Sequence, residues 1–136
     1  MKKAIPMTDA EDLELAVNEL FDRYADGYED YDPQAIASCF AYPTVIWQLE
    51  EGHIFRDNEE LIENLDALLD VHREYGIMQS VYEVVSVDVN GNSAFVTLDW
   101  QQEDEEGDVV FDFTCHYVLM LLEGEWKIAT IINEPN

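Results

Sequence analysis

The sequence predicts an α+β fold in which a strongly curved, mostly antiparallel sheet wraps around a long N-terminal helix, with two further helices beside it. Two observations lead to this prediction. The first half of the 136-residue chain carries capped segments with helical periodicity. The second half consists of long strand-like segments joined by glycine turns. We therefore expect a single cone-shaped domain over residues 1–136, with a pocket between helix and sheet.

The longest helix is predicted near the N-terminus. Thr8 and Glu11 have the spacing of a capping box, which favours a helix start. Apolar and aromatic residues then recur every three or four positions, so one face of the helix is expected to be buried. This stripe consists of Leu13, Val17, Leu20, Tyr24, Tyr28 and Tyr31.

Two shorter helices are predicted to follow. Asp32-Pro33 combines a cap with a proline at the first helical position, and this helix is expected to end near Phe40. Asp57 and Glu60 predict the start of another helix, which ends near Gly76. Its buried side is expected to contain Leu61, Leu65, Leu68 and His72, with His72 in a structural role.

Six strand segments are expected. Proline can begin a strand but has no N–H group for the ladder, so the first strand is predicted at residues 44–49, after Pro43. A short second strand covers residues 53–55, where His53 is expected to be exposed. The next three strands are predicted at residues 78–89, 92–102 and 109–122, and the last one contains residues 125–128.

The turns between these strands predict their register. A two-residue turn at Asn90-Gly91 would pair Val87 with Ala94. Glutamate disfavours the positive φ at the start of a tight turn, so three-residue loops are expected at Glu106-Gly107 and Glu123-Gly124. Asp112 would then lie opposite Trp100, His116 opposite Thr130, and Met120 opposite Trp126. The concave face of the fifth strand would carry Asp112, Thr114, His116, Val118, Met120 and Leu122.

In this register the outer face of the fifth strand is apolar. Its residues would be Phe111, Phe113, Cys115, Tyr117, Leu119 and Leu121. An exposed apolar patch of this size is rare in a monomer, so the sequence predicts a homodimer through Phe111, Phe113, Tyr117 and Leu119. The alternative is that the register is wrong and these residues belong to the core.

The charge of the chain excludes several classes of partner. Thirty-one acidic residues against six basic ones give a net charge of −25, which repels nucleic acid and anionic membranes. The acids are spread along helix faces and loops, which favours a solvated acidic surface over a metal site or a cationic partner. No motif for a metal, cofactor or nucleotide is present.

Other features indicate a cytoplasmic protein. No apolar run approaches the ~20 residues that a membrane span requires, and the basic start at Lys2-Lys3 is not followed by the apolar stretch of a secretory signal. Cys39 and Cys115 lie in unrelated segments, so we expect two reduced thiols rather than a disulfide.

Four segments of the chain form a recognisable pattern: Tyr24 separated from Asp32 by seven residues, the helix at residues 35–40, the Gly-Asn-Ser-Ala-Phe-Val strand start at residues 91–96, and Gly-Glu-Trp-Lys-Ile at residues 124–128. From about Asp9 to Asn133 the chain therefore resembles the nuclear-transport-factor-2-like superfamily. The superfamily includes ketosteroid isomerases, scytalone dehydratase and polyketide cyclases. The resemblance implies a cone fold with a pocket and, often, a sheet-to-sheet dimer.

The resemblance also suggests site residues. Tyr24 falls where the isomerases keep a tyrosine that donates to a developing oxyanion, whereas Trp47 falls at or near their general base and cannot accept a proton. His116 is our first candidate for acid–base chemistry facing Tyr24, and the alternative is a satisfied core histidine bonded to Thr130 or to a tyrosine hydroxyl. Asp112 is a secondary catalytic candidate. The remaining candidate ligand-binding residues are Tyr28, Trp47, Trp100, Met120 and Thr130.

Two functions remain open on this sequence. The first is a pocket that binds a small, largely apolar carbonyl compound and acts as an isomerase, dehydratase or cyclase. The second is a non-catalytic, dimeric interaction module whose cone is filled by large aromatic side chains. An empty cavity that touches Tyr24 and His116 would favour the first, and tryptophan side chains that fill the cone would favour the second.

Overall fold

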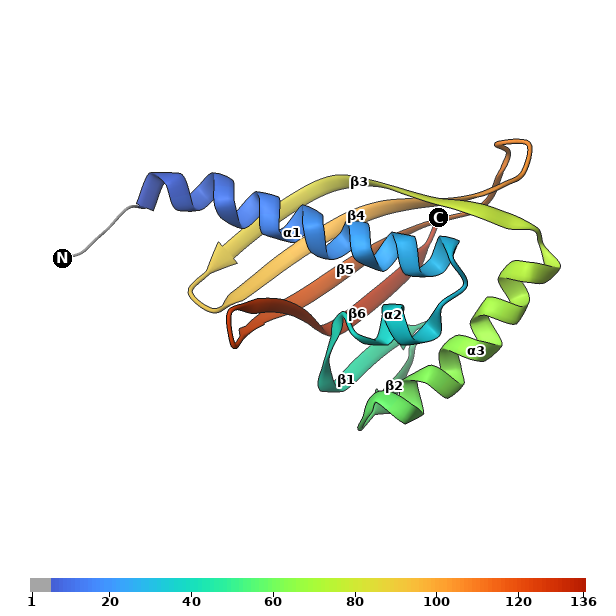
Figure 1. Ribbon diagram of the computed structural model, residues 1–136, viewed down its shortest axis with the longest axis horizontal. Coiled ribbons are helices and arrows are strands. Elements are labelled where there is room, and N and C mark those ends of the chain that lie inside the picture. Colours follow the sequence, from blue (N-terminus) through green and yellow to red (C-terminus); the bar gives the residue numbers. More distant parts are fainter. Residues whose placement is uncertain (1–5) are drawn as a thin grey trace.

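The computed structural model describes residues 6–136, with side chains from Asp12 onward, and contains three helices and six strands in that range (Figure 1). The helices are α1 (Pro6–Glu29), α2 (Pro33–Ala37) and α3 (Asn58–Glu74). The strands are β1 (Phe40–Gln48), β2 (Glu51–Phe55), β3 (Ile77–Asn90), β4 (Ser93–Asp104), β5 (Val109–Leu122) and β6 (Glu125–Pro135).

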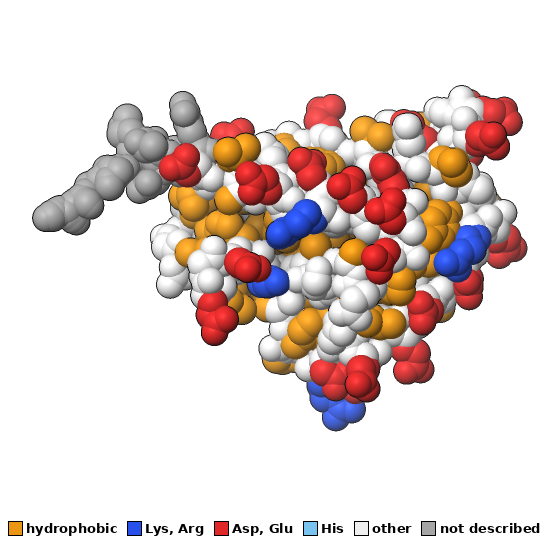
Figure 2. Space-filling view, viewed as in Figure 1, with side chains coloured by type: hydrophobic (Ala, Val, Ile, Leu, Met, Phe, Trp, Pro, Cys, Tyr) orange, Lys and Arg blue, Asp and Glu red, His pale blue; other side chains and the backbone are white. Residues whose placement is uncertain are grey.

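The strands form one curved sheet in the order β2-β1-β6-β5-β4-β3. Neighbouring strands are antiparallel except β1 and β6, which run parallel. Helix α1 lies along the sheet, and α3 lies beside the sheet with its first turn near β2 (Figure 1). The protein therefore has the predicted α+β cone. Acidic side chains are scattered over the face seen in Figure 2, with uncharged side chains between them.

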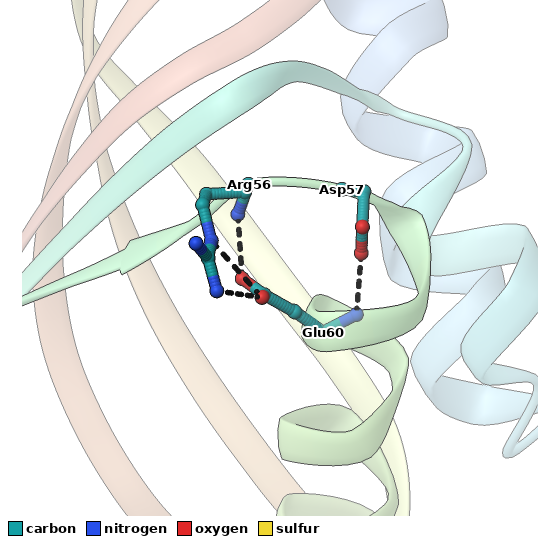
Figure 3. Close-up of polar contacts among 3 residues, drawn as sticks. All are labelled: Arg56, Asp57 and Glu60. Carbon is teal, nitrogen blue, oxygen red and sulfur yellow. Dashed lines mark hydrogen bonds and ion pairs between the residues drawn. The ribbon is translucent and has the colours of Figure 1, made fainter.

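Helix α3 begins where the sequence predicts. Asp57 is its N-cap, and the Asp57 carboxylate accepts a hydrogen bond from the Glu60 backbone N–H at 3.0 Å. The Glu60 carboxylate turns back to Arg56 and accepts from its backbone N–H at 2.8 Å and from its guanidinium at 2.9 Å (Figure 3). These contacts anchor the first turn of the helix that carries His72 near its other end.

The helices differ from the prediction in two details. Helix α1 begins at Pro6, and the predicted capping box of Thr8 and Glu11 lies outside the residues whose side chains are described. On α3, Leu69 rather than Leu68 completes the buried side. Leu68 is 37% exposed, because the stripe drifts around the helix axis as it approaches His72.

Pro43 lies inside β1, contrary to the prediction. The pairing of β1 with β6 is interrupted between Phe40 and Val45. The ladder therefore skips the segment that contains Pro43, and this is how the strand accommodates a residue without an N–H group.

The hairpin of β3 and β4 turns at Gly91 and Asn92, one residue later than predicted, because Asn90 pairs with Ser93. Val87 consequently pairs with Val96 instead of Ala94. Near the turn this shift of two positions keeps each side chain on its predicted face, since successive side chains alternate between faces. A bulge between Val84 and Ser86 then shifts the register by one residue, so that Val84 pairs with Leu98 and the earlier part of β3 lies on the face opposite to the predicted one.

The register prediction for β5 is wrong, and a β-bulge is the reason. The predicted three-residue loop is present, since the Asp104 N–H donates to the Asp108 carbonyl at 3.0 Å and Glu103 pairs with Val109. Gln102 then pairs with Phe111, so Val110 is an extra residue in β5. From there on, every side chain of β5 lies on the face opposite to the predicted one.

The turn after β5 also differs from the prediction. Leu122 pairs with Glu125, so the turn contains only two residues, and Glu123 adopts a positive φ of 51°, which is unfavourable for glutamate. Met120 therefore pairs with Lys127 rather than Trp126, and His116 pairs with Ile132 rather than Thr130.

One continuous core joins α1 to the concave face of the sheet. Its members include Val17, Leu20 and Phe21 from α1, and Leu98 and Leu119 from the sheet, none of them more than 1% exposed. The Phe21 ring centroid lies 4.7 Å from that of Tyr117 on β5. Burial of these side chains is the main stabilising contribution to the fold, at roughly 1.5–3 kcal/mol for each large side chain.

Candidate functional site

A cavity of about 350 Å³ lies between α1, α3 and the concave face of the sheet. Its buried walls come from α1, β4 and β5 and include Tyr24, Tyr28, Trp100, Gln102, Cys115 and Tyr117. Exposed residues mark its mouth between α3 and the strand ends, namely Gln48, Asn64, Leu68, Val71, Asp112 and Pro135. The cavity is therefore largely aromatic in its buried part, and its mouth has both polar and apolar side chains.

Phenol groups gather at the buried end. The hydroxyl oxygens of Tyr24 and Tyr28 lie 3.4 Å apart, and the Tyr117 hydroxyl accepts a hydrogen bond from Trp100 Nε1 at 2.8 Å. One hydroxyl can donate to the other within the Tyr24–Tyr28 pair, which leaves the second hydroxyl proton free to donate elsewhere. The pair thus offers a hydrogen-bond donor to a ligand.

These phenols are neutral at neutral pH. Burial raises the pKa of Tyr28 to about 12. Burial, followed by the proximity of Tyr28, raises the pKa of Tyr24 well above its ordinary value, and burial does the same for the pKa of Tyr117. Each of the three therefore keeps its proton and can act as a donor.

His72 projects from α3 into the same wall and is 4% exposed. Its ring centroid lies 5.5 Å from that of Tyr28, with the two rings tilted by 32°, and 6.4 Å from that of Phe111, with an interplanar angle of 28°. Its Nδ1 atom is buried and has no hydrogen-bond partner among residues 12–136. Burial lowers the pKa of the imidazole, so the ring is neutral at neutral pH.

Asn133 contributes the other unsatisfied polar atom of the cavity wall. Its Oδ1 is buried without a partner in the described part of the chain. Gln102, by contrast, accepts a hydrogen bond from the Ser80 hydroxyl at 2.5 Å. Buried polar atoms are normally paired, and both unpaired ones belong to residues of this cavity.

Four predicted site residues line the cavity: Tyr24, Tyr28, Trp100 and Asp112. Trp100 lies in the wall and does not fill the cavity. Asp112 lies at the rim, where its Oδ1 accepts a hydrogen bond from Asn136 Nδ2 at 2.8 Å.

The other four predicted site residues lie elsewhere. His116 lies on the outer face of the sheet, where its Nδ1 is 3.0 Å from the Thr97 hydroxyl and its Nε2 contacts the Glu134 carboxylate. The prediction that His116 faces Tyr24 is wrong, because the bulge turned the strand over. Trp47, Met120 and Thr130 also lie outside the cavity, and Trp47 borders an open hollow on the outer side.

The predicted dimer residues are on the wrong face for an interface. Phe111 and Phe113 line the cavity, and Tyr117 and Leu119 are at most 2% exposed. Their burial has the same cause as the displacement of His116. The alternative interpretation of this strand, that its apolar residues are core, is the correct one.

Sequence reasoning missed the functional potential of His72. The sequence predicts a buried His72 in a structural role, and the burial is confirmed. The signal available was a histidine at the end of a leucine stripe, and only the absence of a partner for Nδ1 distinguishes it from a structural residue. Asn133 and Cys115 carried no signal in the sequence.

The described residues show no metal site or membrane span. No group of three or more His, Cys, Asp or Glu side chains among them is arranged to hold a metal ion. No helix in residues 6–136 is long and apolar enough to cross a membrane. Cys39 and Cys115 are both free and buried.

Comparison with protein families identifies the chain. Residues 11–136 match the family described as NTF2-like protein (DUF6841). The chain belongs to this family. Among curated proteins, none matches it.

Solved structures with the same fold come from several bacteria. A protein of unknown function from Mycobacterium tuberculosis is 18% identical, with a TM-score of 0.74 over 97% of this chain and 76% of that one. A domain of unknown function with a cystatin-like fold from Nostoc punctiforme is 17% identical, with a TM-score of 0.75 over 90% and 76%. An NTF2-like protein of unknown function from Shewanella baltica is 17% identical, with a TM-score of 0.65 over 98% of each chain. These similarities establish the fold alone.

Proposed function

We propose that this NTF2-like protein binds a small, uncharged, largely apolar molecule whose carbonyl oxygen enters the cavity first. The observation that carries this proposal is the pair of buried phenols, Tyr24 and Tyr28, at the closed end of an otherwise aromatic cavity. A phenol proton without an acceptor suits a carbonyl oxygen, and the aromatic walls suit a flat apolar body.

The charges around the cavity support an uncharged ligand. Its lining, as far as the structure describes it, contains no Lys or Arg and one carboxyl group, Asp112 at the rim. The chain as a whole carries a net charge of −25. A carboxylate or phosphate ligand would be repelled on approach and would find no counter-charge inside.

The same donors suit a reaction in which charge develops on the carbonyl oxygen. A phenol that donates to an enolate oxygen stabilises it in a water-poor site. We therefore propose isomerase, dehydratase or cyclase chemistry on a carbonyl compound. The competing function, a non-catalytic module with a filled cone, is disfavoured by the volume of about 350 Å³ that remains open beside Trp100.

A matched set of bicyclic probes tests the ligand class. We expect β-tetralone, which has a carbonyl oxygen, to raise the melting temperature and to bind more tightly than naphthalene, which has the same shape but no acceptor. β-Naphthoate, which is an anion, is expected not to bind. Equal affinity for ketone and hydrocarbon would contradict the role of the phenols, and failure of every probe would favour the non-catalytic module.

Substitution of the phenols tests the site. Tyr24→Phe and Tyr28→Phe should each weaken β-tetralone binding by about 2- to 10-fold, the equivalent of one net hydrogen bond, and the double variant should weaken it further. Tyr82→Phe is the matched control, because the Tyr82 hydroxyl donates to Asp22 away from the cavity. Isothermal titration calorimetry measures binding by the wild type and by these four variants.

We also propose that the protein is a homodimer through the outer face of the sheet, with other residues than those first predicted. We define the outer patch as Trp47, Phe95, Val118, Met120 and Ile132. Neighbouring strands bring these side chains together, since Phe95 pairs with Val118 and Ile132 pairs with Trp47. The five side chains are uncharged, and acidic residues border them, since Asp88 pairs with Phe95 and Glu134 lies two residues after Ile132. A dimer through this apolar patch would keep the like charges of its two copies at the rim of the interface.

Light scattering after size exclusion tests the dimer. We expect a dimer for the wild type and a monomer for Ile132→Glu, which adds a charge to the centre of the outer patch. Leu15→Glu, at an exposed position of α1, should remain dimeric. A monomeric wild type at high protein concentration would reject this proposal without affecting the cavity.

A further inference from the structure

The fold gives no reason for a histidine at position 72. The position continues the buried side of α3 after Leu61, Leu65 and Leu69, where an apolar residue would pack without a polar atom to satisfy. A structural histidine is normally held by a hydrogen bond, yet the Nδ1 of His72 has none among the described residues. Leaving a buried polar atom unpaired costs roughly 1–3 kcal/mol, which calls for an explanation outside the folding of the chain.

The surroundings of His72 supply that explanation. The imidazole lies beside Tyr28 in the wall of the cavity, with their ring centroids 5.5 Å apart. In a ligand whose carbonyl oxygen accepts a hydrogen bond from the phenol pair, the carbon beside the carbonyl lies two bonds from that oxygen. The imidazole belongs to the same cavity lining as Tyr28 and is one of the few side chains there that can take a proton from such a carbon.

We propose that His72 is the proton-transfer residue of the cavity and acts on the carbon next to the ligand's carbonyl group. This inference rests on the function proposed above. The ligand class is accordingly an uncharged ketone or aldehyde that has a hydrogen on the carbon beside the carbonyl.

The proposed proton transfer needs no cofactor. The imidazole lone pair takes the proton from the carbon, the C–H electron pair becomes the enolate double bond, and the negative charge moves to the oxygen that the phenol holds. The imidazolium then returns a proton to the same carbon or to a carbon conjugated with it. The first outcome exchanges the hydrogen with solvent, and the second isomerises the compound.

Other titratable groups are less suited to this task. Burial raises the pKa of the Cys115 thiol to about 12, so it stays protonated. Asp112 is exposed at the rim and is hydrogen-bonded by Asn136. His116 lies outside the cavity. Burial lowers the pKa of His72, which keeps its lone pair available at neutral pH, as a general base requires.

Hydrogen–deuterium exchange of β-tetralone tests the proposal. Proton NMR in deuterated buffer follows the loss of the signal from the carbon beside the carbonyl, against buffer alone. We expect wild-type protein to accelerate this exchange and His72→Gln to reduce the acceleration by at least about 100-fold. His116→Gln, which alters the histidine on the outer face, should leave it unchanged.

Three further measurements separate a chemical role from a structural one. The exchange rate should rise with pH and level off once the imidazole is neutral, and imidazole added to His72→Ala should restore part of the rate. Binding of β-tetralone to His72→Gln, measured by calorimetry, should persist. Circular dichroism checks that each variant is folded.

The possible outcomes are distinct. Binding of β-tetralone by the wild type without faster exchange would overturn the role of His72 and leave the proposed binding of a carbonyl compound intact. Exchange that persists in His72→Gln would also overturn it. Absence of binding would overturn the proposed function and this inference together.

Discussion

Polar side chains on the outer face of β5 differ in their hydrogen bonding from those around the cavity on its inner side. On the outer face, polar side chains satisfy one another, since Thr114 donates to Asp99 at 2.7 Å and His116 contacts both Thr97 and Glu134. On the cavity side, the Tyr24–Tyr28 pair has a free donor and His72 has no partner for Nδ1. Polar groups that are paired have a structural explanation, whereas unpaired buried ones require another explanation, and a ligand is the one proposed above.

The largest effect is expected from core residues on the inner face. Leu119→Ala should reduce the free energy of unfolding by about 2–5 kcal/mol, because Leu119 is fully buried and the change leaves a cavity. Met120→Ala, one residue later on the outer face, should cost less than about 1 kcal/mol in dilute protein. Urea unfolding monitored by circular dichroism measures both.

These two variants test whether the inner and outer faces of β5 differ in burial. Equal losses for Leu119→Ala and Met120→Ala would mean that the outer face is as buried as the inner one. A loss at Met120 that grows with protein concentration would instead indicate burial in a dimer.

An intermediate effect on stability is expected for Tyr117, the phenol that accepts a hydrogen bond from Trp100. Tyr117→Phe removes the acceptor of Trp100 Nε1, and the resulting unpaired N–H in the core should cost about 1–3 kcal/mol. Thr114→Val removes a comparable hydrogen bond on the outer face, where water can replace it, and should change stability by no more than about 0.5 kcal/mol. Thermal unfolding distinguishes them, and similar losses would contradict the contrast between the faces.

The smallest effect is a pH dependence from His72. Its pKa is lowered in the folded protein, so the unfolded chain binds the proton more readily and stability is lost as pH falls through the unfolded value of about 6.5. His72→Phe should show a shallower loss of unfolding free energy between about pH 7.5 and pH 5.5 than the wild type. Denaturant titrations at each pH measure this slope.

Val71→Ala is the control for this slope. It also removes packing from the cavity wall but carries no titratable group, so its pH dependence should match that of the wild type. A wild-type slope in His72→Phe would show that protonation of the imidazole does not oppose folding.

Local patterns in the sequence were sufficient to predict the elements. Asp57 with Glu60 correctly predicted the start of α3, and the segment from Val109 to Leu122 correctly predicted β5. Caps, turns and periodicity depend on residues a few positions apart, so they can be recognised without knowledge of the tertiary fold. The order of these elements then led to the α+β cone.

Local sequence patterns did not predict which side chains of β5 face the core. The three-residue loop was predicted correctly, but no local residue preference predicts the bulge at Val110. Glu123 also adopts a backbone conformation that glutamate normally avoids. Packing of Cys115, Tyr117 and Leu119 against α1 selects this register, because the alternative would bury His116 and expose the core residues.

In the candidate site, too, some residues could be predicted from local sequence patterns and others only from the folded structure. Tyr24 and Tyr28 follow from a helical stripe that local spacing reveals, whereas the importance of His72 depends on which atoms of other segments come near its ring. Hydrogen-bond satisfaction is a property of the assembled fold and not of any segment, so only the packed structure distinguishes the unpaired His72 from the paired His116.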